Sequence, residues 1–234
     1  MTTASSTRTF DVRHVQIARA VFAALAAVMI TFSPDHSASV GLALFSGFAI
    51  ATGLVLLLAV WLVYPAGRRW PAVGVGIVTV IAGMAGGVYP LRTVTGFFAI
   101  VIAWALLSGL MELIAGWREL AAPTERREIA PGVADARGAV VVGPRSESRD
   151  ALVVGIITLA LGISLLFVQP GYALDYTIEE AHRTFTLTGT TIGVGIFGGY
   201  AAIIAVYLAI AGFSPRPAVE TDESPARTEQ KDSA

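Results

Sequence analysis

The chain has 234 residues, of which 55% are hydrophobic and 14% charged, whereas soluble domains carry about 25% charged residues. Its net charge of −1 excludes bulk attraction to nucleic acid, and the absence of cysteine excludes disulfides and thiolate metal sites. This composition predicts a protein that lies in a lipid bilayer.

Six apolar stretches follow one another along the chain, each about long enough to cross a bilayer. A spanning helix needs roughly 20 mostly apolar residues, and within hydrocarbon a helix satisfies its own backbone hydrogen bonds. We therefore predict an all-α polytopic membrane protein with six transmembrane helices in a membrane domain at 15–213. The predicted spans are 15–32, 38–64, 72–89, 94–116, 151–169 and 191–213.

The first stretch has features of a secretory signal as well as of a membrane helix. A basic region precedes it, as in a signal peptide, and consists of Arg8 and Arg13 in the segment at 1–14 together with Arg19. However, the apolar run of about 18 residues exceeds the usual signal length, and the sequence at 33–36 is a poor cleavage site. We predict an uncleaved spanning helix, with a cleaved signal as the alternative.

The basic residues predict the orientation in the membrane. If the amino terminus is cytoplasmic, 14 of the 16 lysine and arginine residues fall on the cytoplasmic side. Trp61, Trp70 and Trp117 then fall at the inner membrane interface. Both termini are therefore predicted to be cytoplasmic. The abundance of alanine, glycine, valine and arginine suggests a bacterium with a GC-rich genome.

The polar segments are predicted to be connectors. The inner loop at 117–150 holds six arginines and six acidic residues. We expect a flexible linker there, and the alternative is a docking segment for a cytosolic partner. An outer loop is predicted at 170–190, and the polar, proline-rich tail at 214–234 is predicted to be disordered.

The predicted spans form a repeating pattern. A proline follows each of the three outward-running helices and marks a hairpin turn, at Pro34, Pro90 and Pro170. Gly53 and Gly109 follow the first two of these prolines at the same interval, whereas Gly199 follows the third at a longer one. An insertion of about ten residues in the third unit would explain the difference. We predict three parallel helix–Pro–helix hairpin repeats.

Small residues one helical turn apart indicate where helices pack closely in a membrane. Such pairs occur at Gly47 and Ala51, Gly83 and Gly87, Gly189 and Gly193, and Gly195 and Gly199. We expect packing within the bundle, and the alternative is a seam between copies of a homo-oligomer. The predicted helix-packing glycines are Gly47, Gly53, Gly83, Gly87, Gly109, Gly195 and Gly199.

The hairpin unit, with its central proline and its ending Gly-Leu-Met-Glu-Leu-Ile-Ala-Gly-Trp-Arg at 109–118, resembles the short membrane repeat of the HdeD-type acid-resistance proteins. The resemblance extends over about 15–212. It implies a six-helix bacterial inner-membrane protein linked to acid or envelope stress, and it implies no catalytic residues. The enlarged outer loop and the long charged inner loop depart from the family pattern.

Glu112 is the one ionisable residue that we place well inside a predicted span. An acid within a membrane is a candidate functional residue. Because it lies about five residues from Trp117, we expect its side chain to reach the lipid headgroups at the inner interface or to form an ion pair there with Arg68, Arg69 or Arg118. A role in proton transfer is the alternative.

Titratable residues also gather on the predicted outer face, at Asp35, His36, Asp175, Glu179, Glu180 and His182. External acid would protonate these carboxylates and imidazoles and reverse the charge of the face. A pH-responsive surface is therefore one hypothesis, and an ordinary solvated loop surface is the other. The spacing of these residues predicts no metal site.

The motifs of nucleophilic enzymes and of nucleotide binding do not occur in a suitable context. The sequence holds no Gly-x-Ser-x-Gly and no Ser-x-x-Lys. A G-x-G-x-x-G match at 193–198 lies inside an apolar span rather than between a strand and a helix. We predict no cofactor and a non-enzymatic protein that contributes to acid or envelope-stress tolerance. The alternatives are a small transporter or channel for protons or small solutes, and a membrane scaffold.

Overall fold

A computed structural model describes residues 11–64, 69–122, 145–179 and 183–214. Several predictions fall outside these ranges. They concern the amino-terminal segment up to residue 10, the centre of the inner loop at 123–144, the tail after Ser214, and the residues Arg68, Glu180 and His182.

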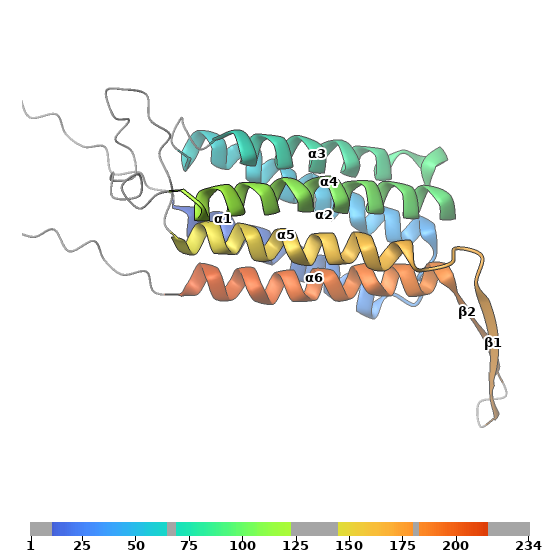
Figure 1. Ribbon diagram of the computed structural model, residues 1–234. Coiled ribbons are helices and arrows are strands. Elements are labelled where there is room, and N and C mark those ends of the chain that lie inside the picture. The colour runs from blue at the N-terminus through green and yellow to red at the C-terminus, as the bar shows by residue number, and fades with distance from the viewer. Residues whose placement is uncertain (1–10, 65–68, 123–144, 180–182, 215–234) are drawn as a thin grey trace, which may run out of the picture.

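The described residues form a bundle of helices that are long and apolar enough to cross a membrane, so the predicted all-α polytopic fold is confirmed (Figure 1). The protein is thus a multi-pass membrane protein. Its spanning helices are α1 (Val12–Phe32), α2 (Ala38–Leu62), α3 (Arg69–Gly87), α4 (Val94–Leu120), α5 (Arg145–Leu166) and α6 (Gly189–Phe213).

The two long connections differ from the prediction. Helix α5 begins at Arg145 and α4 ends at Leu120, so both ends of the predicted inner loop are helical. Glu147 lies in the first turn of α5, where the helix dipole favours an acid, so a polar turn extends the apolar span. The outer loop contains an antiparallel hairpin of β1 (Ala173–Ile178) and β2 (Arg183–Thr188). Both strands contain threonine and an aromatic residue, which favour strands.

Polar caps fix where the helices begin. Asp11 and His14 form a reciprocal capping box at the start of α1. The hydroxyls of Ser37, Thr93 and Thr188 accept hydrogen bonds from backbone N–H groups three residues on, at 3.4, 3.0 and 3.1 Å. Each cap satisfies a donor that the first helical turn leaves unpaired. Helices α2, α4 and α6 begin after the connections that contain Pro34, Pro90 and Pro170, respectively. Pro90 lies in the short 3-10 helix η2 (Tyr89–Leu91).

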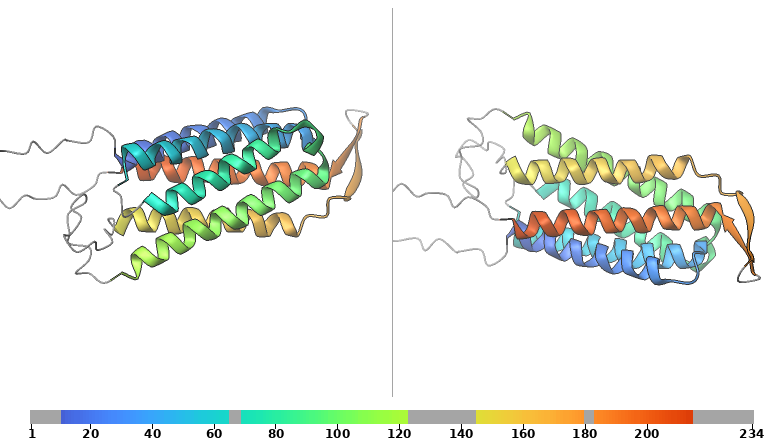
Figure 2. Two further views of the ribbon diagram at one scale, coloured as in Figure 1. Left: turned by 90° about the horizontal axis from the view of Figure 1, so that it is seen from above. Right: turned by 90° about the horizontal axis from the view of Figure 1, so that it is seen from below.

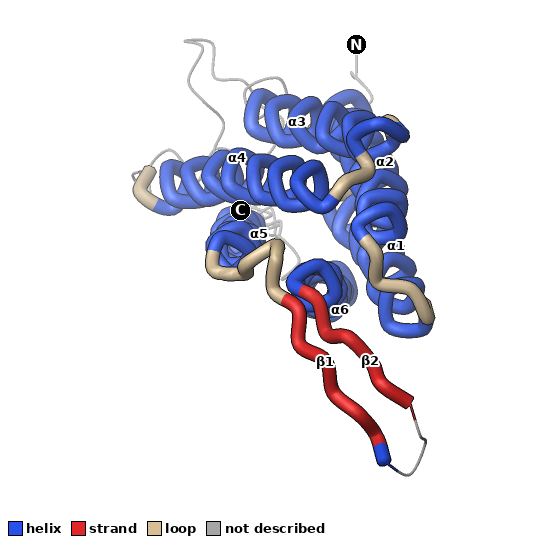
Figure 3. Tube along the Cα trace, turned by 90° about the vertical axis from the view of Figure 1, so that its right-hand side faces the viewer, coloured by secondary structure: helices blue, strands red, loops and turns tan. Residues whose placement is uncertain are grey.

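The helices lie side by side along one long axis, and the β hairpin projects at one end (Figure 2). Viewed along this axis, α1 to α6 follow one another around the bundle (Figure 3). The start of α1 and the end of α6 lie at the same end, which we call the terminal end; we call the other the hairpin end. The most extensive contacts join α1 to α6, α2 to α3 and α4 to α5. The helices on either side of a proline turn pack less extensively.

Glycines allow the close contacts of α2 with α3 and of α4 with α5. A Cβ built on Gly53 would lie 3.0 Å from the carbonyl oxygen of Gly76. A Cβ on Gly155 would lie 2.9 Å from the carbonyl oxygen of Gly109. The backbones therefore approach each other directly at both crossings, as small residues permit. Gly83 and Gly87 also lie in the α2–α3 contact, against Ile50 and Ser46.

Three of the predicted packing glycines do not face another helix. A Cβ on Gly47, Gly195 or Gly199 would meet nothing within 4 Å, so the prediction that they pack within the bundle is wrong. The spacing of small residues identifies a helix face, but it does not say whether that face turns inward.

Two constant intervals relate the inward-running helices to one another. Pro34 and Pro90 are separated by the same number of residues as Phe48 in α2 and Trp104 in α4. The rings of Phe48 and Trp104 are in contact. We call this separation the first repeat interval. The interval from Gly116 in α4 to Gly212 in α6 is the second repeat interval. These two glycines hold equivalent contacts, because a Cβ on Gly116 would meet α5 and a Cβ on Gly212 would meet α1.

By the second repeat interval, the residue of α6 that corresponds to Gly109 is Ala205, and not Gly199 as the sequence suggested. This correspondence requires a longer insertion in the third unit than the roughly ten residues predicted, and the β hairpin lies between α5 and α6, where that insertion would be.

Candidate functional site: a polar cavity at a buried ion pair

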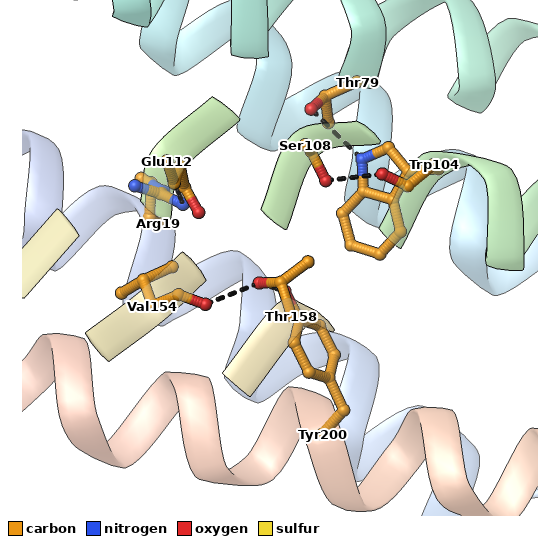
Figure 4. Close-up of polar contacts among 8 residues, drawn as sticks. All are labelled: Arg19, Thr79, Trp104, Ser108, Glu112, Val154, Thr158 and Tyr200. Atoms are coloured by element: carbon orange, nitrogen blue, oxygen red, sulfur yellow. Dashed lines mark hydrogen bonds and ion pairs between the residues drawn. The ribbon is translucent and has the colours of Figure 1, made fainter. Parts of the chain in front are cut away.

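The centre of the candidate site is an ion pair inside the bundle. The Nη2 atom of Arg19 in α1 lies 2.9 Å from Oε1 of Glu112 in α4, and the two side chains are 16% and 10% exposed (Figure 4). Glu112 lies eight residues before the end of α4, about 12 Å along the helix axis. Both charges are therefore held well inside spanning helices.

The prediction that Glu112 pairs with Arg69 or Arg118 is wrong, because the acid turns into the bundle and not toward the membrane interface. Its partner comes from α1, at the other end of the sequence. Arg69 instead donates from Nε to the carbonyl oxygen of Tyr64 at 3.1 Å, and Arg118 lies in the last turn of α4. Arg19, which the sequence assigns to the basic region that flanks the first span, is a second charge inside a span.

A cavity of about 110 Å³ lies between this ion pair and the terminal end of the bundle. All of the helices contribute to its wall. The acidic side chains in the wall are those of Glu112, Glu119, Glu147 and Asp150, and the basic one is that of Arg19. A cavity of this size and polarity can hold several water molecules or a small polar solute.

Neutral donors position Asp150 at the mouth of the cavity. Its Oδ2 accepts a hydrogen bond from Nε2 of Gln16 at 2.7 Å, and its Oδ1 accepts one from the hydroxyl of Tyr207 at 2.9 Å. These bonds connect α5 with α1 and α6. Nearby, the hydroxyl of Ser148 donates to Oε2 of Glu119 at 2.8 Å and connects α5 with α4. Ser148 and Asp150 lie in the segment at 117–150 that the sequence predicts to be a connector.

Three aromatic rings lie across the bundle axis beyond the ion pair. The ring centroids of Phe48, Trp104 and Tyr200 are 5.9, 6.4 and 6.0 Å apart, and every pair meets edge to face. We call these residues the aromatic triad. The indole N–H of Trp104 donates to Oγ1 of Thr79 at 3.1 Å, and the hydroxyl of Tyr200 lies 3.1 Å from Oγ1 of Thr158.

The aromatic triad closes the polar region on the side of the hairpin end. Phe45 and Phe197 contact the triad and are fully buried. The cavity therefore ends partway through the bundle, and apolar, buried rings follow the triad toward the hairpin end.

The acid of the ion pair occupies a position that is apolar elsewhere in the bundle. The first and second repeat intervals place Glu112 in correspondence with Leu56 of α2 and Leu208 of α6. All three residues line the cavity.

A similar correspondence holds for Arg19. The interval from Val75 to Val154 equals the interval between the contact residues Gly76 and Gly155. Ile17 and Leu152 also lie at equivalent contacts, against Gly212 and Gly116, respectively. The separation of Arg19 and Val154 in the sequence equals that of Ile17 and Leu152, so Arg19 corresponds to Val154. Arg19, Val75 and Val154 also line the cavity together. Leucine and valine therefore serve the packing at these positions, and the two charges are an addition to it.

The residues of the predicted outer face are used locally. Oδ1 of Asp35 accepts from the backbone N–H of Ser37 at 2.8 Å and caps the turn before α2. Oδ1 of Asp175 accepts from the hydroxyl of Thr186 on the paired strand at 2.5 Å. His36 lies in the α1–α2 turn, and Glu179 follows β1 at the tip of the hairpin. Within the described ranges, no group of three or more histidine or acidic residues could hold a metal ion.

Two signals in the sequence could have identified the missed site residues. Gln16 and Arg19 are polar and three residues apart, so they share one face of an otherwise apolar helix. The first repeat interval, which relates the prolines, also relates Phe48 to Trp104. The participation of Asp150 and Tyr200 depends on how the helices assemble, which these patterns do not give.

No family model, no curated protein and no solved structure matches the chain, so the comparisons assign no role to this cavity.

Proposed function

We propose that this protein is a non-enzymatic membrane protein of the bacterial cytoplasmic membrane that contributes to acid or envelope-stress tolerance, and that the cavity at Arg19 and Glu112 is its working part. The resemblance of the hairpin unit to HdeD-type proteins supports the physiological role. The observation that carries the assignment to the cavity is the buried ion pair at positions where the other helices have leucine and valine.

The physical argument is that charges inside a membrane protein are expensive and are usually retained for function. A buried ion pair seldom stabilises a fold more than well-packed apolar residues would. Here the chain itself provides the apolar alternative, as Leu56 with Val75. Stability alone therefore does not account for Arg19 and Glu112.

The test is complementation of a gene deletion under acid and envelope stress. The variant that carries both Arg19→Val and Glu112→Leu restores the residues of the corresponding positions, so we expect it to insert and fold. We expect it to rescue survival no better than the empty vector, whereas the wild type rescues fully. The matched control is Leu110→Ala on the exposed face of α4, which should rescue as well as the wild type. Rescue by the double variant, or no survival defect in the deletion strain, would contradict the proposal.

A second candidate function is transport of protons or small polar solutes. The observation that favours it is that a polar cavity reaches from one end of the bundle to charges deep in the spans and is closed beyond them. A cavity that is open at one end and closed at the other corresponds to one state of a transporter whose site opens to each side of the membrane in turn. Flux in proteoliposomes that is lost with Glu112→Gln and kept with Leu110→Ala would establish it. An absence of flux under proton and solute gradients would eliminate it.

The interaction partners remain predictions. A cytosolic partner at 117–150 would bind a segment whose centre lies outside the described residues. Deletion of 123–144 without a phenotype would argue against that partner. A homo-oligomer would have a suitable surface on α6, where Gly195 and Gly199 leave open space one turn apart.

A further inference from the structure

A second, smaller void lies between the ion pair and the aromatic triad. Its volume is about 10 Å³, close to the smallest that accommodates one water molecule. Its wall includes all three triad rings and six polar side chains, those of Arg19, Thr52, Thr79, Ser108, Glu112 and Thr158. It shares Arg19, Leu56, Val75 and Glu112 with the larger cavity, so the two spaces adjoin at the ion pair.

Two buried polar atoms in this wall have no partner within the described part of the chain. They are Nε of Arg19 and Oγ1 of Thr52, and Thr52 is only 4% exposed. An unsatisfied buried donor or acceptor destabilises a fold, so buried polar groups nearly always have a partner.

Other polar groups around the void are satisfied by the protein itself. The hydroxyl of Ser108 donates to the carbonyl oxygen of Trp104 at 2.6 Å. The hydroxyl of Thr158 donates to the carbonyl oxygen of Val154 at 2.8 Å (Figure 4). The unpaired atoms are therefore concentrated on Arg19 and Thr52, next to the ion pair.

The chemistry of these two atoms identifies the ligand. The Nε–H of an arginine can only donate, whereas a threonine hydroxyl can donate and accept. The occupant must therefore accept one hydrogen bond, and it must be small. The Glu112 carboxylate in the same wall provides a further acceptor. Water meets all of these requirements, and a larger anion does not fit.

We propose that a water molecule is bound between Arg19 and Thr52, and that hydration extends from the terminal end past the ion pair as far as the aromatic triad. The bundle then contains a one-sided, water-accessible half-channel. This inference rests on the proposed function, in which the same cavity is the working part of the protein. It concerns the access of water to the cavity and not survival under stress. The two can fail separately.

The test uses the fact that the chain contains no cysteine. Thr52→Cys and Ser108→Cys are near-isosteric and are each made in the full chain, which is reconstituted in oriented vesicles. Silver ions are added on one side, and the remaining thiol is titrated after denaturation. Leu54→Cys, on the exposed face of α2, and Leu42→Cys, fully buried on the hairpin side of the triad, are the controls.

We expect silver to modify the thiols of the Thr52→Cys and Ser108→Cys chains from the terminal side only. Modification should be at least roughly tenfold faster than in the two controls, because only a hydrated thiol ionises readily. Adding Arg19→Val and Glu112→Leu to the Thr52→Cys chain should slow its modification to the control rate, because an apolar void stays dry.

Gel filtration identifies variants that do not fold; if the Thr52→Cys chain is among them, the Ser108→Cys chain carries the test. Equal rates for test and control sites, modification from both sides, or no effect of the apolar pair would overturn the inference.

Discussion

At the scale of single residues, the ion pair of Arg19 and Glu112 makes a prediction about stability. Removing one partner leaves a buried charge without compensation, whereas replacing both by apolar residues of suitable shape is often neutral. We therefore expect Glu112→Leu alone and Arg19→Val alone each to lower the free energy of unfolding by about 3–5 kcal/mol. The double variant should lie within about 1 kcal/mol of the wild type. Unfolding in mixed detergent micelles measures all three.

The correspondence with leucine and valine positions is what this double variant tests. If its loss of stability equals the sum of the single losses, Arg19 and Glu112 contribute independently. The positions are then not equivalent to those of Leu56 and Val75.

Trp104 allows a second prediction at this scale. Its counterpart in α2 by the first repeat interval is Phe48, a ring without a hydrogen-bonding group. Trp104→Phe should keep the edge-to-face packing but leave the buried hydroxyl of Thr79 without its donor. We expect a loss of about 1–3 kcal/mol, largely restored when Thr79→Val is added, as unfolding of the single and double variants in detergent would measure. An undiminished loss in the double variant would assign the effect to ring packing.

At the scale of the elements, the close crossings of α4 with α5 and of α2 with α3 depend on glycine. Gly155→Ala places a methyl group 2.9 Å from the carbonyl oxygen of Gly109, so the two helices must separate. We expect a loss of about 1–3 kcal/mol, as in other overpacked contacts, and a lower unfolding temperature in detergent.

The matched control for this contact is Gly199→Ala in α6, where the added methyl group meets open space. It should leave the unfolding temperature unchanged or raise it slightly, since alanine favours a helix more than glycine does. Equal effects of the two substitutions would mean that the α4–α5 crossing is not as close as described.

At the scale of the whole molecule, the two ends of the bundle should lie on opposite sides of the membrane. The basic residues predict that the terminal end is cytoplasmic. In the cysteine-free chain, a membrane-impermeant maleimide added to intact cells should label Leu174→Cys in β1 and spare Ser214→Cys after α6. Both positions are exposed. Labelling of both, or of Ser214→Cys alone, would refute the predicted orientation.

Much of the fold was predictable because a bilayer imposes strong local rules. A span must be apolar, helical and about 20 residues long, and each of these requirements can be recognised within one segment. The six helices followed from this alone. The start of α5 and the β hairpin did not, because both lie in polar segments where the bilayer imposes no such rule.

The site was predictable only in part. An acid inside a span identified Glu112, because one charge in an apolar run is visible in the sequence. Its partner was not identified, because Arg19 and Glu112 are 93 residues apart and meet only through the assembly of the bundle.

The sequence by itself determined the medium, the number of spans and one charge within them, since each depends on the composition of a single segment. The tertiary structure decided which faces turn inward. The rotation of each helix about its axis is set by packing against its neighbours, and a modest rotation separates a residue in the cavity from one in lipid. The ion pair between α1 and α4, the aromatic triad and the cavity all result from that choice.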